Sequence, residues 1–302
     1  MKAEPEQVKR TQEIEEATNL YFIHPISRVL VTYFARWGVR PNTVSVLGMV
    51  FGGLAALAYY HYAQWPMVVL GFVLMIAWHI MDGSDGQLAR LTGQTSELGK
   101  ALDGLCDHLS FVLIYVSLSL ASAQVLGSWV WILSVAAGIS HVAQATAYEF
   151  QRQAYDYWVF DKASARIVRP KEFEERLPEG RSLARRMLDF MMLSYLRVQF
   201  RMAGVNAMLM ADLEQALQET DDQSMIRQAY RQFNLHAVKS WSLLCSNYRT
   251  LAIFVACLAG NPVYFFLFEF VLLNATLVWL RYMQGRQNRA LQEWLALSMV
   301  NS

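Results

Sequence analysis

The stretch Asp82-Gly-Ser-Asp-Gly-Gln-Leu-Ala-Arg90, followed by Gly99, Asp103 and Asp107, decides the fold. It places four carboxylates within residues 82–107, between two long apolar runs. Positions 82, 85, 86, 89 and 90 fall on one face of a helix, and positions 99, 103 and 107 fall on one face of the next helix. If the two helices fold back on each other, the four aspartates converge. Like charges at such short range repel unless cations neutralise them, so the stretch predicts a metal site.

The composition favours a membrane protein. Of the 302 residues, 55% are hydrophobic and only 17% are charged, whereas an ordinary soluble domain has about 25% charged residues. The net charge of +1 shows no basic bias, so we expect no nucleic-acid partner. The first residues contain no apolar segment of the kind found in signal peptides, and we expect no cleaved leader. Cys106, Cys245 and Cys257 form no C-x-x-C pair, and we interpret them as reduced core residues.

Six apolar runs predict six transmembrane helices, because several approach the ~20 residues that span a bilayer. They cover residues 43–62, 67–81, 105–126, 129–147, 240–258 and 262–280. The second run is short unless its helix continues through the aspartates. Lys and Arg are absent from the connections at 63–66, 127–128 and 259–262 and gather in the other connections. By the positive-inside rule, both termini and the aspartates then face the cytoplasm.

We therefore predict an all-α integral membrane protein with an N-terminal interfacial amphipathic helix, six spans and a helical cytosolic insert between spans four and five. The segments are a polar tail (1–20), the interfacial helix (21–42), spans one to four with the motif 82–107 (43–147), the insert (148–239), spans five and six (240–281) and a cytosolic tail (282–302). Residues 21–42 set apolar positions against Arg28 and Arg36, which is typical of a helix in the membrane interface. A buried helix of a soluble core would give the same pattern. The amphipathic faces of the insert are expected on lipid or on a partner subunit.

The residue types in the stretch indicate which metal and which substrate it binds. Aspartates without Cys or His suit Mg²⁺ or Mn²⁺ rather than zinc. Carboxylates from two helices can hold two ions about 3.5–4 Å apart, an arrangement that neutralises phosphoryl oxygens. Gly86 and Gly99 leave room for a nucleotide near the backbone, and Arg90 offers a planar pair of donors to a diphosphate. The alternative is that intramembrane aspartates serve a proton relay or cation transport.

The pattern D-x-x-D-G-x-x-A-R, eight residues and then G-x-x-x-D-x-x-x-D resembles the signature of the CDP-alcohol phosphotransferases, also called CDP-alcohol phosphatidyltransferases. It stands complete here as Asp82, Asp85, Gly86, Ala89, Arg90, Gly99, Asp103 and Asp107. The resemblance covers residues ~22–150 well and the last two spans loosely, and it gives no guidance for the insert. It implies a cytosol-facing site that transfers a substituted phosphate from a CDP-linked donor to an alcohol and releases CMP.

The resemblance also implies a role for each site residue. Asp82, Asp85 and Asp103 would hold one Mg²⁺ or Mn²⁺ ion, and Asp82, Asp103 and Asp107 would hold a second. Asp107 would also be the general base that accepts the proton of the acceptor hydroxyl. The donor-binding residues would be Asn42, Thr43, Gly86, Arg90 and Ser96. A homodimer in the membrane is a further implication.

The acceptor is harder to read. Two arginines lie where arginine is unusual in a membrane protein. Arg152 is at the end of the fourth span, and Arg249 is inside the fifth. A phosphorylated alcohol would need such a cation, and pairing with the aspartates or with a lipid headgroup is the alternative. We expect CDP-diacylglycerol as the donor, in phospholipid biosynthesis at a bacterial inner membrane. A soluble CDP-alcohol donor, a divalent-cation transporter and an inactive scaffold that docks a partner are the competing readings.

Overall fold

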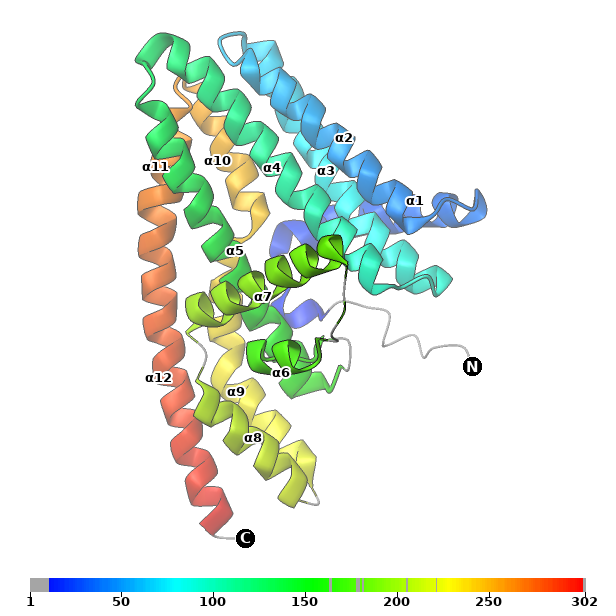
Figure 1. Cartoon of the computed structure of the whole chain (residues 1–302), viewed down its shortest axis with the longest axis vertical. Coiled ribbons are helices and arrows are strands. Elements are labelled where there is room, and N and C mark those ends of the chain that lie inside the picture. The colour runs from blue at the N-terminus through cyan, green and yellow to red at the C-terminus, as the bar shows by residue number, and fades with distance from the viewer. Residues whose placement is uncertain are drawn as a thin grey trace. The chain divides into compact units, whose positions relative to one another are not determined.

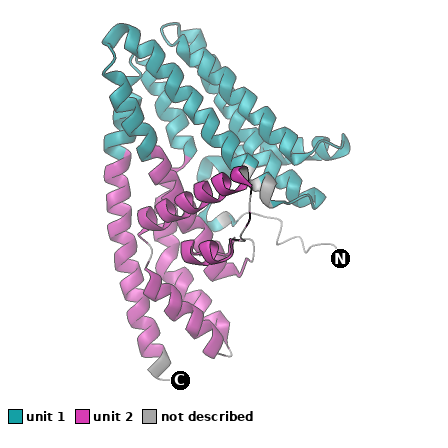
Figure 2. Cartoon of the chain, in the orientation of Figure 1, with its two compact units in different colours: residues 1–140, 246–272 teal, residues 141–245, 273–302 magenta. Residues whose placement is uncertain are grey.

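The computed structural model describes residues 11–162, 165–177, 180, 182–204, 206–220 and 222–300. Within these ranges every regular element is a helix, so the predicted all-α class is confirmed. The same part of the chain contains six helical runs that are long and apolar enough to cross a membrane, as predicted. The chain divides into two compact units, which are described separately below. The first holds residues 1–140 and 246–272, and the second holds residues 141–245 and 273–302 (Figure 2).

The N-terminal segment of the first unit packs onto the later helices. Of the predicted polar tail, residues 1–10 lie outside the described residues, and residues 11–20 include the short turn η1 (Gln12–Ile14) and the start of η2 (Asn19–Ile23). Ile14 and Glu16 are buried, and Glu16 accepts a hydrogen bond of 2.7 Å from Asn247 Nδ2. The second half of this segment is therefore tied to the fifth predicted span rather than extended in solvent.

Helix α1 (His24–Arg36) follows directly and corresponds to the predicted interfacial helix. Ser27 Oγ donates a 2.9 Å hydrogen bond to the Ile80 carbonyl, which fixes α1 against α3. Its other side exposes Val29 and Tyr33, and Trp37 directly after the helix is exposed as well. That exposed apolar side fits a membrane surface, and the interfacial location stays a prediction.

Three long helices of the first unit support the aspartates: α2 (Pro41–Tyr60), α3 (Trp65–Thr92) and α4 (Glu97–Leu126). They pack side by side, with α2 against both others (Figure 1). The second apolar run does continue through the aspartates, because α3 ends only where Gly93 adopts a left-handed conformation (φ +69°) and donates to the Ala89 carbonyl. Four residues then lead into α4, so both aspartate-bearing helices are joined by one tight connection.

Small residues let these helices approach closely. A Cβ atom on Gly52 would lie 2.5 Å from Ser110 Oγ and 2.6 Å from Ser110 Cβ. Gly48 and Gly52 form the G-x-x-x-G spacing of closely packed membrane helices, and this contact between α2 and α4 is the packing role that such spacing favours.

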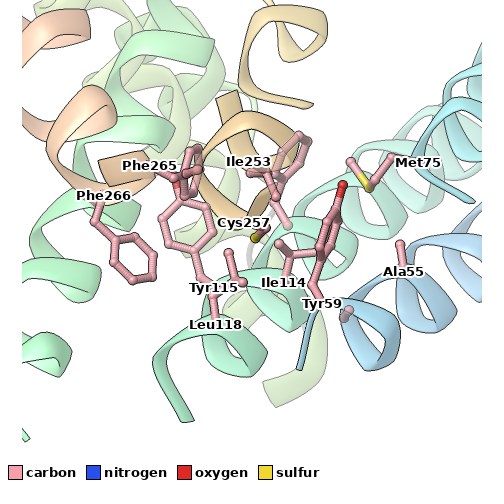
Figure 3. Packing of buried hydrophobic residues seen from close by; sticks show 14 of the residues in the cluster. Ala55, Tyr59, Met75, Ile114, Tyr115, Leu118, Ile253, Cys257, Phe265 and Phe266 are labelled. Atoms are coloured by element: carbon pink, nitrogen blue, oxygen red, sulfur yellow. The ribbon is translucent and has the colours of Figure 1, made fainter. Parts of the chain in front are cut away.

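The core of the first unit lies between these helices and the segments α10 (Ser246–Leu258), α11 (Val263–Leu267) and η5 (Phe268–Leu272). Figure 3 shows Tyr115 facing Phe265, and the two rings meet edge to face with centroids 5.3 Å apart. Tyr59, Ile114 and Ile253 complete the same buried cluster. Cys257 lies within it, and all three cysteines are buried, as predicted for core residues.

The second unit contains the end of α5 (Val130–Phe160) and α12 (Leu273–Val300), together with the helices of the predicted insert. These are α6 (Pro170–Glu175), α7 (Leu183–Ala203), α8 (Ala207–Glu219) and α9 (Gln223–Trp241). Helix α5 continues to Phe160, past the predicted end at 147, because Ala154, Tyr155 and Trp158 still bury one of its faces. The fifth apolar run is interrupted by the turn η4 (Ser242–Leu244) before α10 begins.

Polar side chains fasten α9 to α12 inside the second unit. Trp241 Nε1 donates to Gln284 Oε1 at 3.2 Å, and Gln284 Nε2 donates to Asn234 Oδ1 at 2.7 Å. All three side chains are buried, so these hydrogen bonds supply partners for polar groups that have lost contact with water.

Candidate active site

Three of the four predicted aspartates form one compact group. Asp82 and Asp85 project from α3 and Asp103 projects from α4. One carboxylate oxygen from each lies within 4.8 Å of the other two. Asp85 is buried, and the other two are partly exposed. The helical spacing explains the geometry, since residues three apart on α3 point to the same side and meet the facing side of α4.

Asp107 lies beside this group rather than inside it. It follows Asp103 by one helical turn on α4, and its carboxyl is within hydrogen-bonding reach of Asp82. Its side chain is partly exposed. The structure thus brings all four predicted aspartates together but distinguishes three close ones from a fourth at the edge.

The donor set fits a hard divalent cation. Three carboxylates offer only oxygen ligands, and among the described residues this is the group of His, Cys, Asp or Glu side chains close enough to hold a metal ion. Mg²⁺ and Mn²⁺ prefer such oxygen ligands, and Mg²⁺ keeps further positions for water or phosphate. Without a cation, three carboxylates this close would repel one another at a partly buried location.

Ser45 is a site residue that the sequence analysis missed. Its hydroxyl, on α2, donates a 2.6 Å hydrogen bond to Asp85 Oδ2. A partner of this kind holds a metal-binding carboxylate in one orientation. The only hint in the sequence is that Ser45 stands one helical turn after Asn42, on the helix that begins at Pro41.

His79 is a second residue that was not predicted. It is buried one helical turn before Asp82 on α3, and its Nε2 lies 2.8 Å from Thr250 Oγ1 on α10. Since an imidazole nitrogen and a hydroxyl can each donate or accept, the pair is a hydrogen bond in either tautomer. It fixes α10 against the helix that supports Asp82 and Asp85.

Most of the predicted donor-binding residues gather at the connection between α3 and α4 and at the start of α2. A Cβ atom on Gly99 would lie 3.2 Å from Asn42 Oδ1 and 3.0 Å from Ser96 Oγ. Thr43 follows Asn42 in the exposed first turn of α2. The absence of a side chain at Gly99 therefore keeps open the space that Asn42 and Ser96 line.

Two details refine the predicted roles of these residues. Ser96 caps α4, because its Oγ accepts a 3.0 Å hydrogen bond from Gly99 N. The Arg90 guanidinium folds back along α3, and a Cβ atom on Gly86 would lie 3.3 Å from Arg90 Nη1. Because Gly86 has no side chain, the Arg90 guanidinium can lie against the backbone of α3 one turn before Arg90.

The structure gives Arg249 a partner that was not predicted. Arg249 on α10 is 1% exposed, and its Nε lies 3.1 Å from each carboxylate oxygen of Glu269, which is fully buried on η5. Tyr115 also hydrogen-bonds Glu269. Of the alternatives in the sequence analysis, this geometry supports internal pairing and gives no support to acceptor binding, but the partner is Glu269 rather than an aspartate of the cluster.

Arg152 lies in the second unit and pairs with Glu149 on the same helix. Its Nη2 lies 2.7 Å from Glu149 Oε1, and its Nε donates to Oε2 at 2.9 Å. Nearby on α7, burial raises the pKa of Tyr195 to about 12, and the Glu149 carboxylate adds to the increase. Binding of an acceptor by Arg152 stays a prediction.

Comparison with known protein families assigns the region that contains the site. Residues 38–167 match the family model described as CDP-alcohol phosphatidyltransferase. The match includes all of α2, α3, α4 and α5, and thus every residue of the aspartate cluster.

Curated relatives are similar over about a third of the chain. Ethanolaminephosphotransferase 1 of Pongo abelii is 28% identical over 113 residues, which are 33% of this chain and 28% of that protein. Archaetidylinositol phosphate synthase of Pyrococcus horikoshii is 32% identical over 96 residues, 32% of this chain and 48% of the relative. Cholinephosphotransferase 1 of Bos taurus is 27% identical over 133 residues, 39% of this chain and 32% of the relative. The chain thus spans less than half the length of each of these relatives.

Proposed function

We propose that this integral membrane protein transfers a substituted phosphate from a CDP-linked donor to the hydroxyl of an alcohol and releases CMP, because residues 38–167 match the CDP-alcohol phosphatidyltransferase family. The observation that supports the proposal best is the group Asp82, Asp85 and Asp103, whose oxygens lie within 4.8 Å of one another. A diphosphate can share divalent cations with such carboxylates, and the cations lower the cost of the charge that develops in phosphoryl transfer.

The proposed donor is CDP-diacylglycerol, so that the transferred group is phosphatidyl and the reaction belongs to phospholipid biosynthesis. The six apolar runs support a location in a membrane, where such a donor would be found. The alternative is a soluble CDP-alcohol that delivers a headgroup phosphate. The similarity to proteins named ethanolaminephosphotransferase and cholinephosphotransferase favours this alternative enough to test it.

Within the proposed site, each group has a distinct task. Asp82, Asp85 and Asp103, joined by Asp107, would hold two Mg²⁺ or Mn²⁺ ions, which neutralise phosphate oxygens when bound. Ser45 orients Asp85 through its 2.6 Å hydrogen bond. Arg90 binds the diphosphate over Gly86, and Asn42, Thr43 and Ser96 contact the nucleotide. Asp107 accepts the proton of the acceptor hydroxyl, because a carboxylate at the edge of the cluster is less tightly engaged than the three central ones.

We further propose that the site faces the cytoplasm of a bacterial inner membrane and that two copies associate there. The distribution of Lys and Arg supports the orientation, since the connections at 63–66, 127–128 and 259–262 contain neither residue. Labelling of cysteines introduced into these connections, from one side of intact cells, tests the orientation directly.

An assay of CMP release tests the reaction. The purified full chain is incubated with Mg²⁺ or Mn²⁺, a panel of alcohols and either CDP-diacylglycerol or CDP-ethanolamine, with diacylglycerol as acceptor for the second donor. CMP should form only when donor, acceptor and metal are all present, and the Asp82→Asn variant should form none.

Two results would redirect the proposal. CMP formed from CDP-ethanolamine but not from CDP-diacylglycerol would establish the soluble donor. No CMP from either donor, combined with Mn²⁺ uptake into protein-containing vesicles, would reject the transferase in favour of a transporter.

A further inference from the structure

Helix α7 exposes many large apolar side chains in its first half, whereas its second half is packed. Leu193, Gln199 and Ala203 are buried against the second unit. In the first half of the helix, Leu183, Met187, Phe190 and Met191 are between 57% and 81% exposed, and Leu188 and Met192 beside them are exposed as well. The first four of these residues follow the i, i+4, i+7, i+8 spacing of one helical stripe. The outward side of a helix in water is normally polar, and a contiguous exposed apolar stripe marks a surface that contacts something else.

The contacts of α7 place it at a defined height along α5. Phe200 meets Phe150 edge to face with ring centroids 5.3 Å apart, and Gln151 Nε2 donates to the Ala203 carbonyl at 3.1 Å. Phe150 lies 20 residues beyond Val130, the start of α5, and 20 residues of helix rise about 30 Å, the thickness of a bilayer's hydrocarbon core. Figure 1 shows α7 lying across α5 rather than along it. A span that starts at Val130 therefore leaves the hydrocarbon where α7 is attached.

A second contact gives the same height. Gly204, directly after α7, lies against Arg281 of α12, since a Cβ atom there would be 3.3 Å from Arg281 Nε. Arg281 is the first cation after the sixth apolar run, 262–280. Cations at the end of a span typically mark the membrane–water boundary.

The charge of α7 indicates which surface it contacts. Between residues 183 and 203 the helix has four arginines and one aspartate. Arg185 and Arg186 are exposed in its first turn, next to Leu183 and Met187. Basic residues flanking an apolar stripe suit anionic lipid headgroups.

We propose that α7 is a second interfacial helix of this protein and lies on the anionic surface of the membrane that its spans cross. Leu183, Met187, Phe190 and Met191 enter the boundary between headgroups and acyl chains, while Arg185 and Arg186 contact headgroup phosphates. This inference concerns lipid contact and does not depend on the proposed reaction.

Spin labels on the full chain test the proposal. A nitroxide is attached at Phe190→Cys and, as a control, at Met225→Cys, which is an exposed apolar position at the start of α9. The protein is reconstituted in phosphatidylcholine vesicles with about one third phosphatidylglycerol, an anionic lipid that attracts Lys and Arg. Electron paramagnetic resonance then compares the collision of each label with oxygen, which concentrates in lipid, and with a water-soluble nickel chelate.

The label at 190 should collide mainly with oxygen, and the label at 225 mainly with the nickel chelate. Two outcomes would overturn the proposal: a label at 190 that is as accessible to nickel as the label at 225, or one shielded from both reagents with spin–spin broadening, which would identify a second copy as the occupant. Wild-type protein treated with the same spin-label reagent shows how far the three buried native cysteines react.

The role of the arginines is tested in the same system. The double substitution Arg185→Gln/Arg186→Gln should move the 190 label toward the aqueous phase, and so should vesicles of phosphatidylcholine alone. If the depth of the 190 label changes neither in the double variant nor in phosphatidylcholine alone, then Arg185 and Arg186 do not contact anionic headgroups. Monodisperse elution and an unchanged melting temperature of each labelled variant exclude misfolding.

Discussion

At the scale of single residues, Asp107 lies outside the close group of Asp82, Asp85 and Asp103, although it hydrogen-bonds Asp82 and is repelled by all three carboxylates. We predict that Asp107→Asn lowers turnover by about 10²–10⁴-fold, the usual contribution of a general base. Binding of the CDP donor should change little, because Asp82, Asp85 and Asp103 keep their carboxylates. CMP release and calorimetric titration of the donor measure the two effects. Unchanged turnover would reject the role of Asp107 as base, and the Asp82→Asn variant provides the comparison in which metal binding also weakens.

Ser45 permits a test of carboxylate orientation. Ser45→Ala removes the 2.6 Å hydrogen bond to Asp85 Oδ2, and loss of such an outer partner typically weakens metal affinity by about 10–100-fold. We predict a rise of this size in the Mg²⁺ or Mn²⁺ concentration that gives half-maximal activity, with turnover at saturating metal largely retained. Ser45→Thr keeps the hydroxyl and should restore the wild-type metal requirement. Equal metal requirements in Ser45→Ala and wild type would exclude the orienting role.

These two residues also show how far sequence reasoning reached. The spacing of Asp82, Asp85, Asp103 and Asp107 predicted their convergence because helical periodicity alone determines which residues share a face. Ser45 is 40 residues from Asp85, and its contact depends on how α2 packs, which no local pattern encodes. A serine near the end of an apolar helix is too common to single out without that packing.

At the scale of helices, the close contact of α2 and α4 makes Gly52 sensitive to a single methyl group. A Cβ there would lie 2.5 Å from Ser110 Oγ and 3.4 Å from Ser110 Cα, so the two helices would have to separate. We predict that Gly52→Ala destabilises the protein by about 1–3 kcal/mol, as overpacking usually does. Gly53→Ala is the matched control, because its nearest neighbour would be Leu113 Cδ1 at an ordinary 3.7 Å. Melting temperatures in detergent compare them, and equal values for the two variants would contradict the packing.

The ion pair between Arg249 and Glu269 joins α10 to η5 in the core of the first unit. Removing one partner of a buried pair leaves an uncompensated charge and costs about 3–5 kcal/mol. We therefore predict that Arg249→Ala and Glu269→Ala each lower the melting temperature strongly, and that the apolar double variant Arg249→Met/Glu269→Leu recovers much of the loss. If Arg249 instead bound a phosphorylated acceptor, Arg249→Ala would raise the acceptor KM selectively and leave the donor KM unchanged.

The helices show the same division between what was predictable and what was not. Hydropathy located six helical runs that are long and apolar enough to cross a membrane, and it also suggested that the second would have to continue through the aspartates, as α3 does to Thr92. The continuation of α5 to Phe160 could not be predicted from hydropathy, because residues 148–160 are too polar to read as a span, although they bury one face. The pairing of Arg249 with Glu269 could have been anticipated, since a cation inside a span needs an anion, but only the aspartates and a lipid headgroup were considered as its partners.

At the scale of the whole molecule, the aspartate cluster should couple metal binding to stability. A cation present at about 100 times its dissociation constant stabilises the folded state by about 2.7 kcal/mol. We predict that chelation with EDTA lowers the melting temperature of the wild-type protein and that Mg²⁺ or Mn²⁺ restores it. Asp85→Asn should melt higher than wild type in EDTA, because one of three close negative charges is gone, and should lose the response to metal. A variant that still responds to metal like wild type would place the cation elsewhere.

The length of α3 has a consequence for how the enzyme would meet its substrate. Asp82 stands 17 residues after Trp65, the first residue of the helix, which is about 26 Å of rise and slightly less than the ~30 Å of hydrocarbon. A lipid-linked donor could thus present its diphosphate to the aspartates while its acyl chains stay in the bilayer. On that proposal the encounter is confined to two dimensions. The rate would follow the mole fraction of donor in the membrane, and diluting the surface with inert lipid would slow the reaction even at a constant bulk concentration.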